Sequence, residues 1–379
     1  MMGNMLLMTA MNRQPTDVTA AVPKMWVDVA ARIMGVPYLD VLRDPALATR
    51  TIVAAARRIG ADGARLLLFP QRRIEMNGDK YEHRAADGRL IGEIDFLGGW
   101  GTRLQDNRDF CLENPDQIAH FQLWHSSTPL VRDLEDVRRI CIPDADYYEK
   151  AGYGATVATA LAEAGDAVGC IGDCNSGTLS FQVALRGMDN ALLDLLDEPE
   201  MTAAIMDKGI AMALERARFF ARRGVRILRY NDSTANMSVI SPALWREYIL
   251  PRLREFCTQA HRLAPDVRIY CHICGNILPI AADLAASGLD CIAPLDPLGG
   301  FTVGQIRSIV GQGTVLMGGV NTLSFLNSSE QEIAAEARRC IREGRQGGSF
   351  VLGSGCVLPR QTRLENLQAM IRTAHEPES

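Results

Sequence analysis

Residues 201–232 read MTAAIMDKGIAMALERARFFARRGVRILRYND, and this stretch decides the fold. In its first part, 201–223, apolar residues such as Ile205, Ile210, Ala213 and Ala217 recur at helical spacing. Residues 225–232 then form a short, mostly apolar run of the kind that becomes a buried strand. A long amphipathic helix that leads into a buried strand is the repeating unit of an α/β fold with parallel strands.

The same alternation recurs through most of the chain. Eight apolar runs are predicted to be strands, namely 20–26, 65–71, 167–174, 225–232, 267–274, 289–296, 314–321 and 349–353. Strands that alternate with helices pair in parallel through helical crossovers. Eight of them with an outer layer of helices predict an α/β fold of the (β/α)₈ TIM-barrel type.

Local signals at helix starts support this assignment. Ser241 precedes Pro242, which places a capping side chain before a proline that suits the first turn of a helix. The pairs Ser329 with Glu332 and Thr362 with Glu365 have the spacing of a capping box, in which the two side chains satisfy free backbone N–H groups. We expect these residues to be structural.

One segment, 72–110, departs from the alternation. It contains the turn dipeptides Asn77-Gly78 and Asp87-Gly88 between short alternating runs, which is typical of β-hairpins. The sequence therefore predicts a single TIM-barrel domain over 1–379, with a β-hairpin insertion at 72–110 after the second strand. Loops that follow barrel strands build the active sites of such proteins.

Composition limits the class of partner. The 379 residues carry 40 Lys and Arg against 45 Asp and Glu, for a net charge of −5, and only 6% are aromatic. An acidic chain lacks the basic face that nucleic-acid binding requires, so no nucleic-acid partner is expected. No run approaches 18 apolar residues, so no membrane span is expected either.

The ten cysteines indicate a cellular compartment. The N-terminus has a short apolar run but neither a basic region before it nor a cleavage site, which argues against secretion. We therefore expect a cytoplasmic protein whose thiols are reduced. Most reduced thiols are buried small hydrophobic groups, and a few are metal ligands or nucleophiles.

The carboxyl ends of barrel strands face the active site, so polar residues at these ends are candidates for function. Apart from the metal candidates below, the sequence places there Gln71, 173–175, 230–232, Asp296 and Asn321. We expect Gln71, Asn175, Tyr230, Asn276 and Asn321 to bind substrate. Each has a structural alternative, because Asp and Asn also cap the helices that follow strands.

The sharpest combination is His272-Ile273-Cys274, together with Cys356 after the eighth strand. Side chains alternate along a strand, so His272 and Cys274 point to the same face. One His and two Cys make three protein ligands, which for zinc is the pattern of a catalytic site with an open fourth position. The alternative is that Cys274 and Cys356 are buried filler residues.

The run 270–276, Tyr-Cys-His-Ile-Cys-Gly-Asn, with Gly355-Cys356 before Leu358-Pro359, resembles the uroporphyrinogen decarboxylase superfamily. More narrowly, it resembles the zinc-dependent corrinoid methyltransferase branch that includes the coenzyme M methyltransferases. The resemblance extends through 130–143, 231–251 and 311–321. It implies a TIM barrel with Zn²⁺ held by His272, Cys274 and Cys356.

The resemblance also implies a reaction. Members of this branch move a methyl group between a small molecule (a methyl ether, a methylamine or a thiol) and the cobalt of a corrinoid. The chain has no Asp-x-His-x-x-Gly cobalamin signature, so a separate corrinoid protein would carry the cobalamin. Asp232 and Asp296 are the candidate catalytic carboxylates, as proton acceptors or groups that orient the substrate. Relatives are often dimers, so a homodimer is possible.

Two departures from the family pattern matter. The basic Arg-Gln-Ala-Gly-Arg signature of true uroporphyrinogen decarboxylases is replaced at the corresponding place by 22–29, Val-Pro-Lys-Met-Trp-Val-Asp-Val. Residues 172–175 read Gly-Asp-Cys-Asn where many relatives have Gly-Pro-Phe, so the substrate is not carried over. Two alternatives stay open: a decarboxylase or lyase that works without metal, and a corrinoid-handling protein without catalysis.

Overall fold

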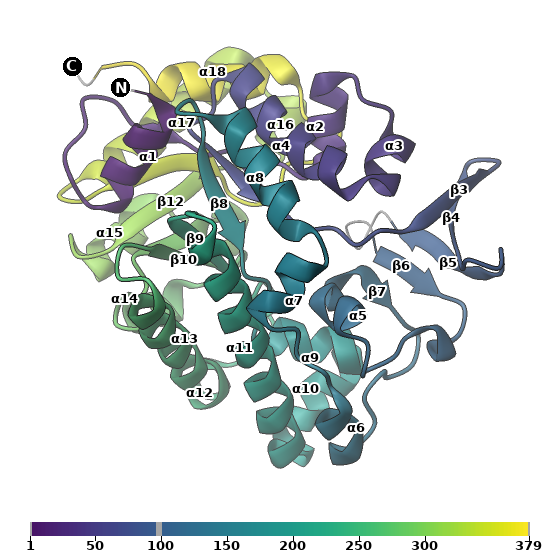
Figure 1. Ribbon diagram of the computed structural model, residues 1–379. Helices are drawn as coiled ribbons and strands as arrows, with labels where there is room; N and C mark the ends of the chain where they lie inside the picture. Colours follow the sequence, from purple (N-terminus) through teal and green to yellow (C-terminus); the bar gives the residue numbers. More distant parts are fainter. Residues whose placement is uncertain (1, 96–100, 378–379) are drawn as a thin grey trace.

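The computed structural model describes residues 2–95 and 101–377. The chain forms an eight-stranded parallel sheet that curls into a barrel with helices around its outside (Figure 1). The strands lie in the order β1-β13-β12-β11-β10-β9-β8-β2. They are β1 Ala20–Ala21, β2 Gly63–Leu66, β8 Gly169–Asp173, β9 Ile227–Asn231, β10 Arg268–His272, β11 Cys291–Leu295, β12 Val315–Val320 and β13 Phe350–Ser354. The predicted TIM-barrel class is confirmed.

Each predicted run overlaps one of these strands, and the second run shows the largest shift. Residues 65–71 were expected to be extended throughout, whereas β2 ends at Leu66. The apolar residues that follow, Leu67, Leu68 and Phe69, are buried in the core outside the strand. Burial alone therefore explains this part of the run, because a buried loop has the same apolar composition as a buried strand.

A side chain and the backbone together close the seam between β1 and β2. The backbone N–H of Asp62 donates to the carbonyl of Ala21 at 2.8 Å, and Asp62 Oδ2 accepts from the N–H of Ala21 at 2.7 Å. His375, near the C-terminus, lies 2.8 Å from the same Oδ2 through its Nε2. One carboxylate therefore joins the two end strands of the sheet to the last part of the chain.

The helices pack apolar faces against the outside of the barrel. In α11 (Pro199–Arg222) the predicted face is buried, including Ile205, Ala213 and Ala217. The other helices are α1 Gly3–Met11, α2 Val27–Met34, α3 Tyr38–Arg43, α4 Pro45–Ile59, α5 Pro115–Ala119, α6 Leu134–Arg139, α7 Ala145–Lys150, α8 Tyr153–Ala164, α9 Leu179–Arg186, α10 Met188–Asp197, α12 Pro242–Leu244, α13 Leu250–Leu263, α14 Ala281–Ala285, α15 Val303–Val310, α16 Ser324–Asn327, α17 Glu330–Arg345 and α18 Leu364–Ala374. Among the described residues, none of the helices combines the length and the apolar composition that a membrane crossing requires.

Two of the three predicted helix starts are confirmed. The hydroxyl of Ser241 accepts from the N–H of Leu244, and Ser329 forms a capping box with Glu332. The third is wrong. Helix α18 begins after Arg363, and within the described part of the chain the buried hydroxyl of Thr362 has no hydrogen-bond partner. The spacing of a capping box was present, but the chain enters this helix one residue later than predicted.

A second, smaller sheet lies between β2 and β8 in the sequence. Its strands are β3 Arg73–Asn77, β4 Lys80–Arg84, β5 Leu90–Asp95, β6 Gly101–Leu104 and β7 Trp124–His125. Strands β3 to β6 pair antiparallel; Asn77 ends β3 and Gly78 follows it in the turn to β4, and Asp87-Gly88 lies between β4 and β5. Residues 96–100 of the predicted insertion lie outside the described residues. The insertion 72–110 within a single domain stays a prediction.

This smaller sheet is packed onto the barrel. Leu104 of β6 and Trp124 of β7 share an apolar cluster with Phe181 and Leu185 of α9, the helix that follows β8. Figure 1 shows β7 and α5 beside α9 and α10, on the side of the barrel where β8 ends. The packing therefore places the segment around β7 next to the mouth of the barrel.

Candidate metal centre

Three predicted ligands meet at the mouth of the barrel. His272 is the last residue of β10, and Cys274 follows two positions later. Cys356 lies two positions after the end of β13. One ligand atom from each of the three side chains lies within 4.8 Å of the others, although the residues come from two strands that are separated by two others in the sheet. The barrel curvature brings these strand ends together above its axis.

The donor set suits zinc. Zinc prefers imidazole nitrogen and thiolate sulfur, and three protein ligands leave one tetrahedral position open. Around a tetrahedral zinc the ligand atoms would lie about 3.5–4 Å apart, from Zn–S and Zn–N bonds of about 2.3 and 2.1 Å. The three ligand atoms lie within 4.8 Å of one another, so a small inward movement of the side chains would bring them to these distances.

The imidazole of His272 is available as a ligand. The side chain is only 2% exposed, and its Nδ1 is buried without a hydrogen-bond partner among the described residues. Burial, aided by the positive charges of Arg229, Lys24 and Arg65, holds the pKa of His272 well below its usual range. The ring is therefore neutral at physiological pH, which is the form that binds metals.

The two thiols interact with each other. Their hydrogen bond lowers the pKa of Cys356 to about 7 and raises the pKa of Cys274, and burial opposes ionisation of both. One proton is thus shared between two sulfur atoms. A metal ion that binds both thiolates replaces this proton, which is why metal binding to such a pair depends on pH.

The loop that carries Cys356 is fixed by Lys24, a residue that the sequence reasoning did not select. Lys24 is 1% exposed, and its Nζ donates to the carbonyl of Ser354 at 3.0 Å. The backbone N–H of Lys24 donates to Ser354 Oγ at 3.1 Å, and that hydroxyl donates to the carbonyl of Cys356 at 2.7 Å. The signal in the sequence that could have identified Lys24 is its position, a lysine inside an apolar run just after the first strand.

The loop that carries Cys274 is fixed by a carboxylate. Asp296, just after β11, accepts from the N–H of Gly275 at 3.2 Å through Oδ2 and from the N–H of Leu298 at 3.0 Å through Oδ1. Gly275 has a φ of 83°, a left-handed conformation that glycine adopts without strain. The chain can therefore turn directly after Cys274 and return its N–H to Asp296.

Beneath the ligands lies a buried layer of charge. Arg229 of β9 donates to Asp173 of β8 at 2.6 Å, and Arg65 of β2 donates to the carbonyl of Met25 at 3.1 Å. Burial opposes ionisation of Asp173, but Arg229 and Arg65 lower its pKa below the usual value. The buried Lys24 lies close enough to Arg65 and Arg229 for both to lower its pKa, so positive charge is in excess below the neutral imidazole.

The two predicted catalytic carboxylates have different surroundings. Asp296 lies close enough to the thiols to raise the pKa of both Cys274 and Cys356. Asp232 is fully buried and accepts hydrogen bonds from the hydroxyl of Thr178 and, at 2.8 Å, from the N–H of Ser180. Its side chain therefore binds the first turn of α9. This contact agrees with the structural alternative stated above, in which the carboxylate caps a helix.

The residues predicted to bind substrate are not gathered in one place. Asn175, with a φ of 66°, donates to the carbonyl of Ala119 at 3.0 Å, and Tyr230 stacks on Phe256 at 4.8 Å in the helix layer. Asn276 and Asn321 accept from backbone N–H groups two positions later, at 3.1 and 2.9 Å. Gln71 donates to the carbonyl of Arg43 at 2.7 Å and lies beyond the end of β2.

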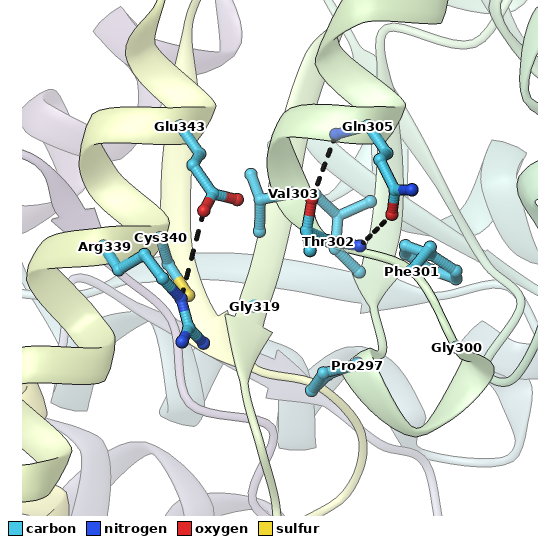
Figure 2. A pocket seen from close by; sticks show the side chains of 11 residues that line it. Pro297, Gly300, Phe301, Thr302, Val303, Gln305, Gly319, Arg339, Cys340 and Glu343 are labelled. Carbon is cyan, nitrogen blue, oxygen red and sulfur yellow. Dashed lines mark hydrogen bonds and ion pairs between the residues drawn. The ribbon is translucent and has the colours of Figure 1, made fainter.

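A cavity outside the barrel is separate from these ligands. Its volume is about 350 Å³. Figure 2 shows lining residues from α15 on one side and from α17 on the other. Thr302 and Gln305 form a capping box at one wall, and Arg339 and Glu343 pair at 3.9 Å at the other. It contains Cys340 and none of the three metal candidates.

Fold and site together define a class: a parallel α/β barrel with one imidazole and two thiols at the carboxyl ends of its strands. Comparison with known proteins then identifies the family. The sequence profile of the uroporphyrinogen decarboxylase (URO-D) family matches residues 125–377, and the chain belongs to that family. The resemblance predicted from the sequence is confirmed.

Curated relatives carry methyltransferase names. A methylated-thiol–coenzyme M methyltransferase of Methanosarcina mazei is 27% identical over 204 residues, 52% of each chain. A methylcobamide:CoM methyltransferase of Methanosarcina barkeri is 24% identical over 172 residues, 45% of this chain and 48% of its own. This chain thus spans about half the length of the curated relatives it matches. A solved methyltransferase from Methanosarcina mazei has the same fold, with a TM-score of 0.71, 17% identity and 98% coverage of both chains.

Proposed function

We propose that this protein is a methyltransferase that moves a methyl group between a small molecule and the cobalt of a corrinoid. Zinc at His272, Cys274 and Cys356 would activate the small molecule, and a separate corrinoid protein would carry the cobalamin. The convergence of these three side chains within 4.8 Å supports the proposal most directly. The names of the curated relatives point to the same chemistry.

When bound here, zinc supplies Lewis acidity, which stabilises a thiolate or polarises the oxygen of a methyl ether. The chain's own residues hold and orient the ligands. Low pKa keeps the imidazole of His272 neutral, and the backbone loops after β10 and β13 are fixed by Asp296 and Lys24. Asp296 is the nearest identified carboxylate that can orient a substrate or accept a proton beside the thiols.

The proposal includes a partner and a compartment. The corrinoid protein would dock over the barrel mouth, because the ligands lie at the carboxyl ends of the strands. All ten cysteines lie among the described residues and are free thiols there. The cytoplasmic location stays a prediction. A homodimer stays a prediction.

The test couples metal analysis to a spectral assay. Purified protein is expected to hold about one zinc per chain and to methylate cob(I)alamin from at least one compound in a panel of methyl ethers, methylamines and methylated thiols. Assays in the reverse direction offer methylcobalamin and a thiol. The proposal fails if zinc is absent and no methyl transfer occurs in either direction.

The same measurement detects the metal-free alternative. A decarboxylase or lyase on this barrel would show substoichiometric zinc and would lose no activity with a chelator. In that case Asp296 and His272 would have to handle protons without a metal. Activity that disappears with chelation and returns with added zinc contradicts this alternative.

A further inference from the structure

The buried charges below the candidate metal centre point into the barrel. Arg65 of β2 pairs in register with Ile171 of β8, and Ile171 pairs with Ile227 of β9. Paired residues of parallel strands share a face, and so do residues two apart on one strand, such as Ile227 and Arg229. Both isoleucines belong to an apolar cluster that takes residues from seven of the eight barrel strands, namely Ala20, Ile171, Ile227, Tyr270, Cys291, Val315 and Val351. Such a cluster can only lie inside the barrel, so Arg65 and Arg229 do too.

This layer of charge is shielded from solvent. The side chains of Lys24, Arg65 and Arg229 belong to residues that are 1, 3 and 6% exposed. Below them, helix α1 closes the barrel with four buried residues of the same apolar cluster, Leu6, Leu7, Ala10 and Met11. Bulk water therefore cannot stabilise these charges, and their partners must lie within the barrel.

Several nitrogen atoms of the layer are not used by the protein. Arg65 donates to the carbonyl of Met25 through Nη2, and Arg229 donates to Asp173 and Asn231 through its two Nη atoms. Among the described residues, Nε and Nη1 of Arg65 and Nε of Arg229 are buried without a hydrogen-bond partner. A buried donor without an acceptor is costly, and more so when it is charged. The layer therefore offers unused cationic donors to an acceptor.

The carboxylates near the layer do not balance its charge. Asp173 pairs within it, but Arg216 of α11 adds a further cation beside Asp173. Asp296 and the thiol of Cys356 face Lys24 from the rim, where the proposed zinc would use the negative charge of the thiolate. Burial lowers the pKa of Lys24 to about 8, so the ammonium is still mostly protonated at pH 7. Positive charge thus stays in excess.

We propose that a small monovalent inorganic anion, of the size of chloride, binds inside the barrel between the guanidinium groups of Arg65 and Arg229. Water can accept from the unused N–H groups but cancels no charge, whereas an anion does both. The weakly hydrated guanidinium group suits a buried ion pair. Because the surrounding residues are at most 6% exposed, a single small ion fits the site better than an organic anion.

The anion also has a place beside a metal candidate. His272 lies next to Asn231 in register, directly above Arg229 on the neighbouring strand, and its Nδ1 is buried without a hydrogen-bond partner among the described residues. A histidine that binds metal through one ring nitrogen usually donates from the other to an acceptor. The anion supplies that acceptor. The inference does not depend on the substrate or the direction of the proposed reaction.

The first test measures stability against chloride. Purified protein is unfolded in urea at constant ionic strength and zinc content, while sodium gluconate, whose anion is too large for the site, is replaced stepwise by sodium chloride. An anion that binds only the folded state with a dissociation constant of about 10 mM or tighter raises the folding equilibrium constant at least tenfold between about 1 and about 100 mM chloride. A smaller rise overturns the inference.

A substitution assigns the effect to the layer. Arg65→Met removes one cation and two unused nitrogen atoms but keeps the apolar part of the side chain. In gluconate this variant is expected to be at least as stable as the original protein, because a buried charge without a full set of partners is gone. Its folding equilibrium constant should change less than twofold with chloride. A tenfold chloride effect that persists in folded Arg65→Met overturns the inference.

Arg307 of α15 provides the matched control. It is also buried, at 4% exposure, but its guanidinium group donates to four backbone carbonyls, those of Gly311, Thr314, Gly344 and Ser349. Arg307→Met is therefore expected to be less stable in both salts and to keep the tenfold chloride effect. Loss of the chloride effect in this variant as well would show a general salt effect and would overturn the inference.

Bromide locates the ion without any variant, so the inference stays testable if Arg65→Met does not fold. Crystals of the original protein are soaked in sodium bromide, and anomalous scattering is expected between Arg65 and Arg229. Bromide on the surface only, an adventitious ion, overturns the inference. Neither result bears on the proposed methyl transfer, which zinc analysis and cob(I)alamin methylation test separately.

Discussion

The two loops that supply the thiols do the same task with opposite charges. The loop after β10, with Cys274, is held by the carboxylate of Asp296 through backbone N–H groups. The loop after β13, with Cys356, is held by the buried ammonium of Lys24 through a backbone carbonyl. A backbone offers both donors and acceptors, so either sign of side chain can fix a loop. We call these two side chains braces. Asp296 is the negative brace and Lys24 is the positive brace, after the charge that each brings to the thiols.

Removal of a thiol should have the largest effect and should affect both loops equally. Cys274→Ala or Cys356→Ala is expected to weaken zinc binding about 1,000-fold or more, because each ligand carries several kcal/mol of a binding free energy of roughly 10–16 kcal/mol. Competition with a chromophoric chelator measures this affinity. The exposed Cys141→Ala is the control. Full zinc affinity in either ligand variant would show that the site is elsewhere.

Loss of the positive brace should come next. Lys24→Met removes the bond to the Ser354 carbonyl but keeps the apolar part of the side chain, and we expect about 10- to 100-fold weaker zinc binding, as for other groups that support ligands. Burial already lowers the pKa of Lys24 to about 8, so the metal-free variant should be no less stable. Denaturant unfolding and chelator competition give the two values.

A second lysine provides a matched control for this variant. Lys208 of α11 also donates to a backbone carbonyl, that of Ile140 at 3.0 Å, but far from the ligands in the sequence and in the helix layer. Lys208→Met should leave zinc affinity unchanged. If both variants bind zinc like the original protein, Lys24 fills space and does not position Cys356.

Loss of the negative brace should have a smaller effect. Asp296→Asn keeps one acceptor oxygen, so about one hydrogen bond is weakened, and zinc binding is expected to fall about 3- to 10-fold at ~1 kcal/mol per bond. Asp232→Asn is the comparison, since its carboxylate binds the start of α9. That variant should lower the free energy of unfolding with little change in zinc affinity. If Asp232→Asn weakened zinc binding and Asp296→Asn only lowered the free energy of unfolding, the roles assigned to the two carboxylates would have to be exchanged.

The smallest expected effect lies at the seam, away from both loops. The hydrogen bond with Asp62 raises the pKa of His375 above its usual value. A raised folded-state pKa stabilises the protein fully below the unfolded pKa of about 6.5, and this contribution is lost as pH rises through the folded value. The Tm difference between the original protein and His375→Gln should therefore shrink above about pH 6.5. A difference that grows with pH would contradict this assignment.

The eight strands could be predicted because they depend on local patterns, and the proposed ligand set, which stays a prediction, was chosen from the same kind of pattern. Apolar runs mark buried strands, and the period of two puts His272 and Cys274 on one face. The surroundings of Asp232 and Asp296 could not be predicted, because both follow strands and only the paths of the loops decide which N–H groups each accepts. The direction of Tyr230 depends on strand register in the same way: its neighbour Asn231 pairs with His272, so Tyr230 points to the helix layer, and its role in substrate binding stays a prediction.

Lys24 and the pocket around Trp124 show a different limit. The lysine contacts a residue 330 positions away, and the pocket lined by Trp26, Trp124, Ser180 and Asn231 joins segments from four parts of the chain. No pattern within one segment reports such contacts. The only local signal was an ionisable residue, Lys24, in an apolar run. This signal indicates that the side chain is buried, but it does not identify the residue that the side chain contacts.

The separation between Lys24 and Ser354 also has a consequence for biosynthesis. The ribosome releases the chain from its N-terminus, so Lys24, His272 and Cys274 emerge long before the loop that holds Cys356. Until residue 356 is added, a nascent chain presents only an incomplete set of ligands. If the proposed zinc site is correct, zinc would be captured at full affinity only after the eighth strand has been made and docked between β1 and β12, and metal loading would be a late step in the maturation of this protein.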